Sequence, residues 1–194
     1  ESGGEVHACA AAYSEADFAE LLTLCDEIDF NSFAQLNQFR PNMNGSLKFG
    51  LRINPECSTQ PEDHAIYDPC APQSRLGIRR HDFEGQSLEG ISGLHFHTLC
   101  EQDFPPLQRT LDAVEERFGH LLADMEWVNF GGGHHISRPG YQIDELVARI
   151  REFSEKYGVQ VYLEPGEAVA IGSGVLVAEV LDLAWNGLDQ AILD

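Results

Sequence analysis

Basic residues are scarce in this sequence. Its 194 residues include 12 Lys and Arg against 32 Asp and Glu, which gives a formal net charge of −20. Proteins that bind nucleic acid need clustered cations for the phosphates, so this charge argues against that class. An acidic surface attracts cations, and polyamines are one class of ligand that fits, although solubility alone also accounts for the charge.

Regularly spaced cysteines and long hydrophobic runs are also lacking. The five cysteines are an odd number, and none belongs to a Cys-x-x-Cys pair, which indicates free thiols in a reducing compartment. The sequence has no signal peptide and no apolar run long enough to span a membrane. These absences predict a cytoplasmic protein with no membrane or nucleic-acid partner.

Short β-rich runs alternate with amphipathic helices along most of the chain. We expect strands at 6–12, 28–30, 47–54, 91–97, 127–130 and 159–163, with a long loop at 57–75. Strands that alternate with helices pair in parallel through right-handed crossovers. The pattern fits either an open doubly wound sheet or an incomplete eight-stranded barrel.

The pattern changes after Pro165. Residues 168–184 are almost continuously β-prone, and no helix is predicted there. We therefore expect a β/α domain over 1–167 and the start of a C-terminal β-rich domain over 168–194. A complete β/α barrel takes about 250 residues. The chain also lacks an initiator Met and stops at Asp194 without a tail, so we expect it to be part of a larger protein.

Four predicted strand ends carry residues that a pure core would not. Arg52 interrupts an apolar strand, and a buried cation there needs an anion. His95 and His97 share one face of their strand, which suits either a metal pair or a flat cofactor ring. Gly131-Gly132-Gly133 forms a tight turn or lets backbone N–H groups approach a phosphate. Glu164 needs a cationic partner, such as a protonated pyridine nitrogen.

Taken in this order, these strand ends resemble those of the fold-type III pyridoxal 5'-phosphate (PLP) decarboxylases, which share a barrel with alanine racemase. Segments 67–77, 93–101 and 130–136 look like carboxynorspermidine (carboxyspermidine) decarboxylase. The resemblance covers essentially the whole chain. It implies a (β/α)8 TIM-type barrel, here incomplete because its first strands are missing, that runs into the start of a C-terminal β domain.

The resemblance also implies a role for each cofactor-binding residue. His97 would stack on the pyridine ring, and Glu164 would hold the pyridine N–H. Arg52 would help to orient the ring. Backbone amides of Gly131, Gly132 and Gly133 would bind the phosphate, and Gly166 would complete the cofactor site.

Two positions depart from the family pattern. The residue after Glu-Pro-Gly is usually an arginine that reaches the phosphate, but here it is Glu167. The serine expected three residues after the stacking histidine is Cys100. We expect Glu167, together with His135, to contact the amines of a polycationic substrate.

The family's Schiff-base lysine has no counterpart in this sequence. Its only lysines are Lys48, which is expected to precede its strand, and Lys156, which is expected near the end of a helix. The family also takes a catalytic Cys and Asp from a partner subunit, which implies a homodimer with shared active sites. No catalytic residue is therefore assigned within this chain, and the chain alone is expected to be inactive.

The implied activity is PLP-dependent decarboxylation of carboxynorspermidine or carboxyspermidine to norspermidine or spermidine, a step of polyamine biosynthesis. One alternative is a metal-dependent TIM-barrel hydrolase that uses His95, His97, His134 and His135. A second alternative is a non-catalytic relative that binds PLP or a polyamine.

Overall fold

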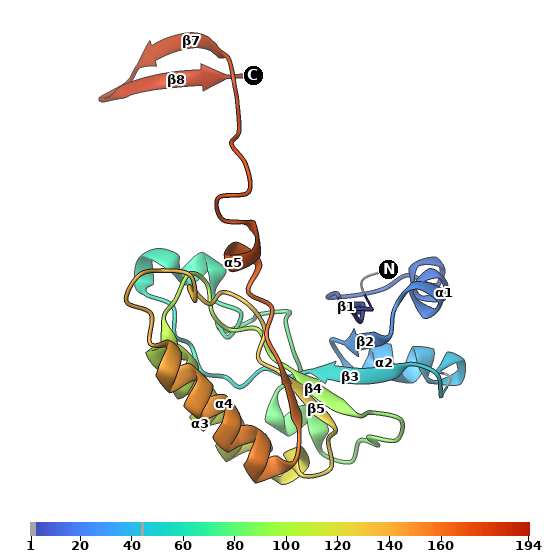
Figure 1. The fold of residues 1–194 in the computed structure, drawn as a ribbon. Coiled ribbons are helices and arrows are strands. Elements are labelled where there is room, and N and C mark those ends of the chain that lie inside the picture. Colours follow the sequence, from blue (N-terminus) through green and yellow to red (C-terminus); the bar gives the residue numbers. More distant parts are fainter. Residues whose placement is uncertain (1–2, 44) are drawn as a thin grey trace.

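Six parallel strands curl into a half-barrel in the computed structural model, which describes residues 3–43 and 45–194, without the side chains of residues 63 and 64 (Figure 1). The strands follow one another in sequence order: β1 (His7–Cys9), β2 (Glu27–Phe30), β3 (Lys48–Arg52), β4 (Gly93–His95), β5 (Trp127–Asn129) and β6 (Gln160–Tyr162). A barrel keeps one direction around the sheet, whereas a doubly wound sheet reverses it. The barrel prediction is confirmed. Residues 1 and 2 of the predicted first domain lie outside the described residues.

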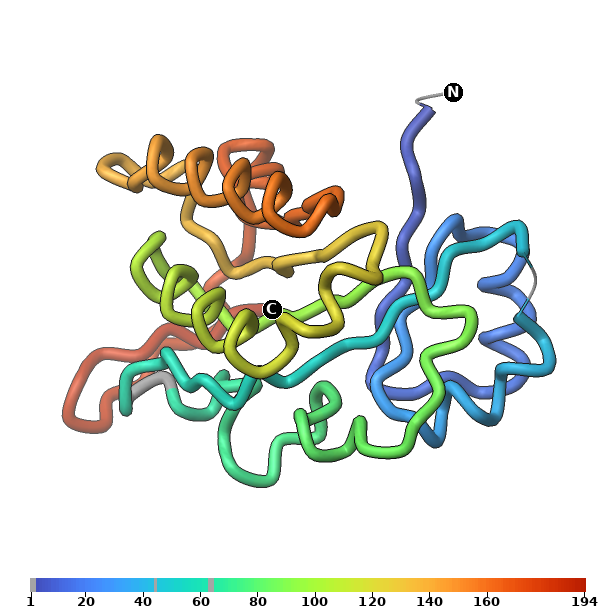
Figure 2. Tube along the Cα trace, turned by 90° about the horizontal axis from the view of Figure 1, so that it is seen from below, coloured from blue at the N-terminus to red at the C-terminus, as the bar shows by residue number. Residues whose placement is uncertain are grey.

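Four helices cover the outer face of the sheet: α1 (Glu15–Leu24), α2 (Phe33–Phe39), α3 (Phe104–Leu122) and α4 (Ile143–Tyr157). Helices α3 and α4 run side by side in both views (Figures 1 and 2). Ser14 caps the beginning of α1, because its hydroxyl accepts a hydrogen bond from the N–H of Asp17. Gly158 ends α4 in the left-handed conformation. No helix in the described part of the chain is both long and apolar enough to cross a membrane.

The two faces of the half-barrel differ in character. Fully buried side chains on the outer face, among them Leu51, Leu94 and Val128, pack in one hydrophobic core with the helices. The alternate positions point to the inner face, because side chains alternate along a strand. The inner row nearest the carboxyl ends is polar and lies in register across four strands: Arg52, His95, Asn129 and Tyr162.

The sheet curls strongly enough for its two edge strands to meet. The ring of His7 on β1 lies 4.8 Å from the ring of Tyr162 on β6, edge to face. The Tyr162 hydroxyl also donates a hydrogen bond to Glu5 at 2.9 Å. A cavity of about 520 Å³ lies beside these residues and extends to Asn129 and Glu164.

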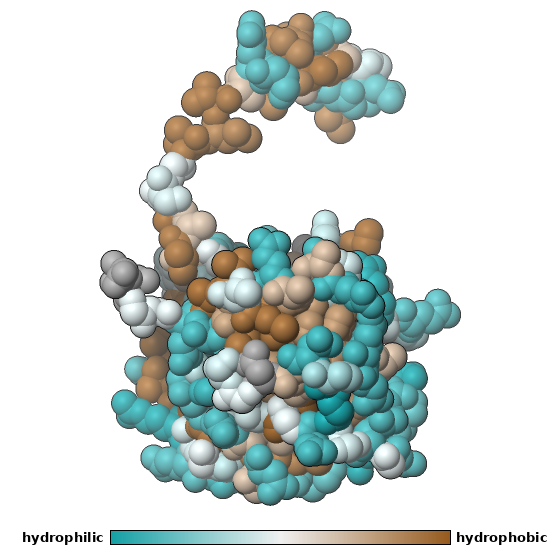
Figure 3. All heavy atoms as spheres, turned by 90° about the vertical axis from the view of Figure 1, so that its right-hand side faces the viewer, coloured by the Kyte–Doolittle hydropathy of each residue, from teal (hydrophilic) through white to brown (hydrophobic). Residues whose placement is uncertain are grey.

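The chain beyond β6 departs in part from the prediction. Helix α5 (Gly166–Ala170) occupies a stretch where no helix was expected. The reason is local: Glu167 stands in its first turn, where a carboxylate favours the helix dipole, and alanines follow. The β-prone residues then form an extended segment and an antiparallel hairpin of β7 (Val180–Trp185) and β8 (Asp189–Leu193). This hairpin stands away from the half-barrel and exposes apolar side chains (Figure 3).

Candidate functional site

Glu164 is the centre of a polar cluster at the carboxyl ends of the strands, the edge where barrel enzymes carry their active sites. The amide of Asn129 donates a hydrogen bond to Oε1 of Glu164 at 2.9 Å. The Nδ1 atom of His97 lies 3.4 Å from Oε2, and the Nε2 atom of His95 lies 3.6 Å from Oε1. The structure therefore brings Glu164 and both histidines together. Sequence analysis missed Asn129 as a partner of this carboxylate.

The histidines decide the charge of Glu164. Burial acts to raise its pKa, but hydrogen bonds with His95 and His97 outweigh burial and hold the pKa well below its ordinary value. The carboxylate is therefore ionised throughout the neutral pH range. An ionised carboxylate of fixed orientation is the partner that a protonated ring nitrogen requires.

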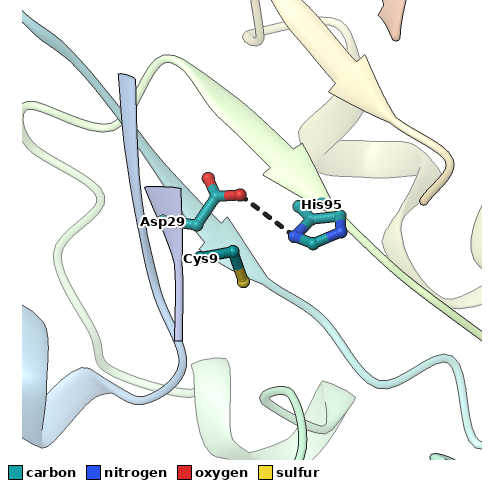
Figure 4. Close-up of side chains that lie close together, drawn as sticks. All are labelled: Cys9, Asp29 and His95. Atoms are coloured by element: carbon teal, nitrogen blue, oxygen red, sulfur yellow. Dashed lines mark ion pairs between the residues drawn. The ribbon is translucent and has the colours of Figure 1, made fainter. Parts of the chain in front are cut away.

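A further carboxylate, Asp29 of β2, lies behind His95 and was also missed by sequence analysis. Its Oδ2 atom is 3.0 Å from Nδ1 of His95, and both side chains are almost completely buried (Figure 4). Burial acts to lower the pKa of His95, but Asp29, Cys9 and Glu164 raise it well above its ordinary value. An available signal was the strand sequence itself, in which Glu27 and Asp29 alternate with apolar residues.

The three glycines form a close turn against the segment that follows β4. Gly131 and Gly133 have φ angles of +72° and +78°, which L side chains rarely adopt. A Cβ on Gly131 would lie 2.4 Å from the carbonyl oxygen of Phe96. The N–H of Gly132 points at Nδ1 of His97, 3.3 Å away. The turn therefore brings the backbone N–H of Gly132 beside the predicted stacking histidine.

Arg52 also lies beside His97. Its Nη2 atom donates to the carbonyl oxygen of His97 at 3.4 Å, which places a cation next to the cluster. The lysines lie elsewhere: Lys156 is near the end of α4, as predicted, whereas Lys48 is the first residue of β3 and does not precede that strand. Neither lysine stands at the carboxyl end of a strand.

The two predicted substrate residues contact each other. Nε2 of His135 lies 2.6 Å from Oε2 of Glu167, with His135 buried and Glu167 partly exposed. Gly166 begins helix α5, and its N–H donates to the carbonyl oxygen of Glu164 at 2.8 Å. This hydrogen bond fixes the start of α5, and with it Glu167, close to the Glu164 cluster.

The four-histidine metal set of the hydrolase alternative is not assembled within the described residues. His134 instead contacts the carbonyl oxygen of Gly131 at 3.0 Å, and His135 pairs with Glu167. Potential metal ligands gather there in two groups of three, and neither group includes His134 or His135: Cys9, Asp29 and His95; and His95, His97 and Glu164.

The long loop after β3 is fastened by two asparagines at strand ends. Asn31 donates to the carbonyl oxygen of Arg75 and accepts from the N–H of Gly77, both at 2.8 Å. Asn54 donates to the carbonyl oxygen of Leu76 at 3.2 Å. A cavity of about 730 Å³ is lined by this part of the loop and by both asparagines.

Comparisons with known proteins agree with this geometry. No family model matches the chain. A carboxynorspermidine/carboxyspermidine decarboxylase of Campylobacter jejuni is 47% identical over 190 residues, which are 98% of this chain and 49% of that protein. A carboxyaminopropylagmatine decarboxylase of Synechocystis is 40% identical over 94% of this chain and 47% of its own length.

A solved structure agrees as well. The crystal structure of the Campylobacter jejuni carboxynorspermidine decarboxylase complexed with norspermidine superposes with a TM-score of 0.83 at 44% identity. The match covers 99% of this chain and 49% of that one, so the chain spans about half the length of the relatives it matches. Over nearly its whole length, this chain is similar to the carboxynorspermidine/carboxyspermidine decarboxylases in sequence and in the arrangement of its strands.

Proposed function

We propose that this chain carries the cofactor site of a PLP-dependent carboxy-lyase that converts carboxynorspermidine or carboxyspermidine to norspermidine or spermidine. The observation that carries the proposal is the position of the Glu164 carboxylate at the carboxyl ends of the strands, in contact with His95, His97 and Asn129. The names of the relatives supply the reaction and the substrate class.

The residues present fit PLP. Glu164 supplies an ionised carboxylate for the pyridine N–H, and His97 supplies a flat ring at the rim of the site with 37% of its side chain exposed. A Cβ on Gly132 would lie 2.4 Å from the carbonyl oxygen of Glu164 and 3.1 Å from the ring of His97. Only a residue without a side chain can therefore pack this closely against both groups.

PLP, when bound, supplies an electron sink for the pair of electrons left by the loss of CO₂. Glu164 accepts the hydrogen bond of the pyridine N–H and so holds its proton in place, while Asn129 keeps the carboxylate oriented. His97 covers the ring and excludes water from that side, and Arg52 adds positive charge nearby. A phosphate that takes the N–H of Gly132 would replace His97 as its partner.

The substrate would be bound through its amines. Glu167 is 43% exposed and lies against the buried His135, so its carboxylate can face an incoming ammonium group while it remains anchored. The net charge of −20 favours a polycation in the same way. The Synechocystis relative is named for a different carboxylated amine, so the length and end group of the amine chain are the features to compare in assays.

The remaining parts of the proposal concern the whole protein. We place the domain boundary after Glu167, with a PLP-binding barrel at 1–167 and a β-rich domain that starts at 168. The protein would act in the cytoplasm as a homodimer with shared active sites. The covalently binding lysine and the partner's Cys and Asp would come from outside this chain.

The test replaces Glu164 with Gln in the full-length protein. Loss of the carboxylate should lower kcat by about a hundredfold to a thousandfold, because the ring nitrogen then loses its anionic partner. The matched control is Glu155→Gln on the exposed surface of α4, which should leave kcat unchanged. Decarboxylation is measured with carboxynorspermidine and carboxyspermidine, and cofactor content by its absorbance. Full activity in the Glu164→Gln variant would refute the proposal.

A further inference from the structure

Asp29 and His95 form a buried ion pair that the proposed cofactor contacts do not use. Oδ2 of Asp29 lies 3.0 Å from Nδ1 of His95, although the two residues stand on strands β2 and β4 (Figure 4). Gly50 of β3 lies between them, and a Cβ there would come within 2.2 Å of Oδ1 of Asp29. The pair therefore forms because the intervening strand carries no side chain at this position.

The second ring nitrogen of His95 faces Glu164, at 3.6 Å from Nε2 to Oε1. A neutral imidazole has one N–H and can donate to only one of two carboxylates, whereas an imidazolium donates to both. Cys9 of β1 also faces the ring, and Arg52 of β3 is its register neighbour. With Asp29 on one side and Glu164 on the other, a ring that donates to both carboxylates must carry both protons.

Among the three side chains that contact Glu164, His95 is the one that a second carboxylate holds in place. Asn129 offers a neutral amide. The side chain of His97 is 37% exposed, and its ring is the one expected to stack on the cofactor. The side chain of His95 is only 2% exposed, and Asp29 holds it from behind. His95 is therefore a fixed partner of Glu164 beside Asn129, and Asp29 in turn holds His95.

We propose that Asp29 and His95 are positioning residues for Glu164, and through it for the protonated ring nitrogen of the cofactor. Asp29 fixes the ring of His95, and His95 together with Asn129 fixes the orientation of Glu164. This inference rests on the proposed PLP function and deepens it. Asp29 then influences the cofactor without touching it.

The test replaces Asp29 with Asn in the full-length protein loaded with PLP. We expect kcat to fall about tenfold to a hundredfold, the range seen when the outer partner of a ligating group is removed. KM should change little, because Asp29 lies apart from the Glu167–His135 pair. The matched control is Glu27→Gln, two residues earlier on β2. Burial and the nearby Asp29 raise the pKa of Glu27 to about 8, so it is mostly neutral at pH 7 and its amide should leave kcat unchanged.

A second measurement separates positioning from a merely structural role. PLP labelled with ¹⁵N in the ring is titrated in the bound state by NMR. The ring nitrogen should lose its proton at a lower pH in the Asp29→Asn variant than in the unmodified protein, whereas Glu27→Gln should titrate like the unmodified protein. An unchanged titration together with an unchanged kcat would overturn the inference.

The outcomes distinguish this inference from the function on which it rests. If the unmodified protein neither retains PLP nor releases CO₂, the proposed function itself fails. If it does both and Asp29→Asn matches it, only the positioning role fails. If Asp29→Asn does not fold by circular dichroism, ¹⁵N NMR of His95 in the unmodified protein decides: a cationic ring at pH 7 supports the role, and a neutral ring overturns it. Bound zinc that is lost on Cys9→Ser would also overturn it, since these residues would then be metal ligands.

Discussion

Gly93 of β4 should not tolerate alanine, although its backbone is ordinary extended strand. Its inner face is covered by the indole of Trp127, which is fully buried. A Cβ on Gly93 would lie 2.0 Å and 2.1 Å from two ring atoms of Trp127. Atoms of a rigid, enclosed ring cannot move aside, so the substitution overpacks the inner face. Overpacking costs about 1–3 kcal/mol, and the lower entropy of the unfolded alanine chain offsets about 0.4–1 kcal/mol of that. We expect Gly93→Ala to lower the free energy of unfolding by about 1–2 kcal/mol.

Urea unfolding followed by circular dichroism measures this loss, and a double-mutant cycle assigns it to the indole. In a Trp127→Leu background, Gly93→Ala should cost less than about 0.5 kcal/mol, because the smaller side chain leaves room. The matched control is Gly119→Ala on α3, where a Cβ would meet only the hydroxyl of Tyr157 at 3.5 Å, an ordinary contact. That change should stabilise the protein by up to about 1 kcal/mol. A Gly93→Ala protein as stable as the unmodified one would refute the packing argument.

Two other predictions concern charged pairs. Glu115 on α3 accepts hydrogen bonds from Arg149 and from two further residues of α4. Burial acts to raise the pKa of Glu115, but these contacts lower it. Glu115→Gln should therefore lower the free energy of unfolding by about 1–3 kcal/mol near pH 7. Because the folded pKa of Glu115 is depressed, the stability difference between the two proteins is present above the unfolded pKa and is lost as the pH falls through the folded pKa. Urea unfolding at a series of pH values measures this difference, and a difference that stays the same in acid would contradict the argument. Glu167→Gln should raise KM for the polyamine substrate about tenfold with little change in kcat, because a charged hydrogen bond to a substrate amine is lost. Steady-state kinetics of this variant and of His135→Asn test whether the two residues act as one unit.

Most of the fold could be predicted from local patterns. The six strands, the Ser14 cap of α1 and the helix that ends before Gly158 follow from apolar periodicity and capping residues. Helix α5 was missed because valine and alanine in a short stretch suit either structure, and the carboxylate of Glu167 in the first turn decided the outcome. The choice between barrel and doubly wound sheet depends on strand order, which periodicity does not report.

The candidate site was predictable only where a residue is unusual for its position. Glu164 and His97 stand at the ends of apolar strands, so they were noticed, and the structure brings them to 3.4 Å. Asn129 was passed over because a neutral amide at a strand end carries no electrostatic cost that requires explanation. Its role depends on the neighbouring strand, which brings Glu164 within 2.9 Å.

Asp29 shows why the deeper part of the site could not be derived from local sequence. Its contact with His95 joins strands that are not adjacent in the sheet, and it passes over Gly50 of the strand between them. Three conditions must hold together: the order β2, β3, β4, a register that aligns Asp29 with Gly50, and the absence of a side chain at Gly50. Each condition is unremarkable alone. Gly50→Ala should therefore disturb the site as well as the core, because its Cβ would displace both the Asp29 carboxylate and the Trp127 indole. For Gly93→Ala, the three atoms nearest to the new Cβ all belong to the indole. If both variants lose stability but only Gly50→Ala also lowers kcat, the pair of Asp29 and His95 belongs to the chemistry of the site and not only to the packing of the barrel.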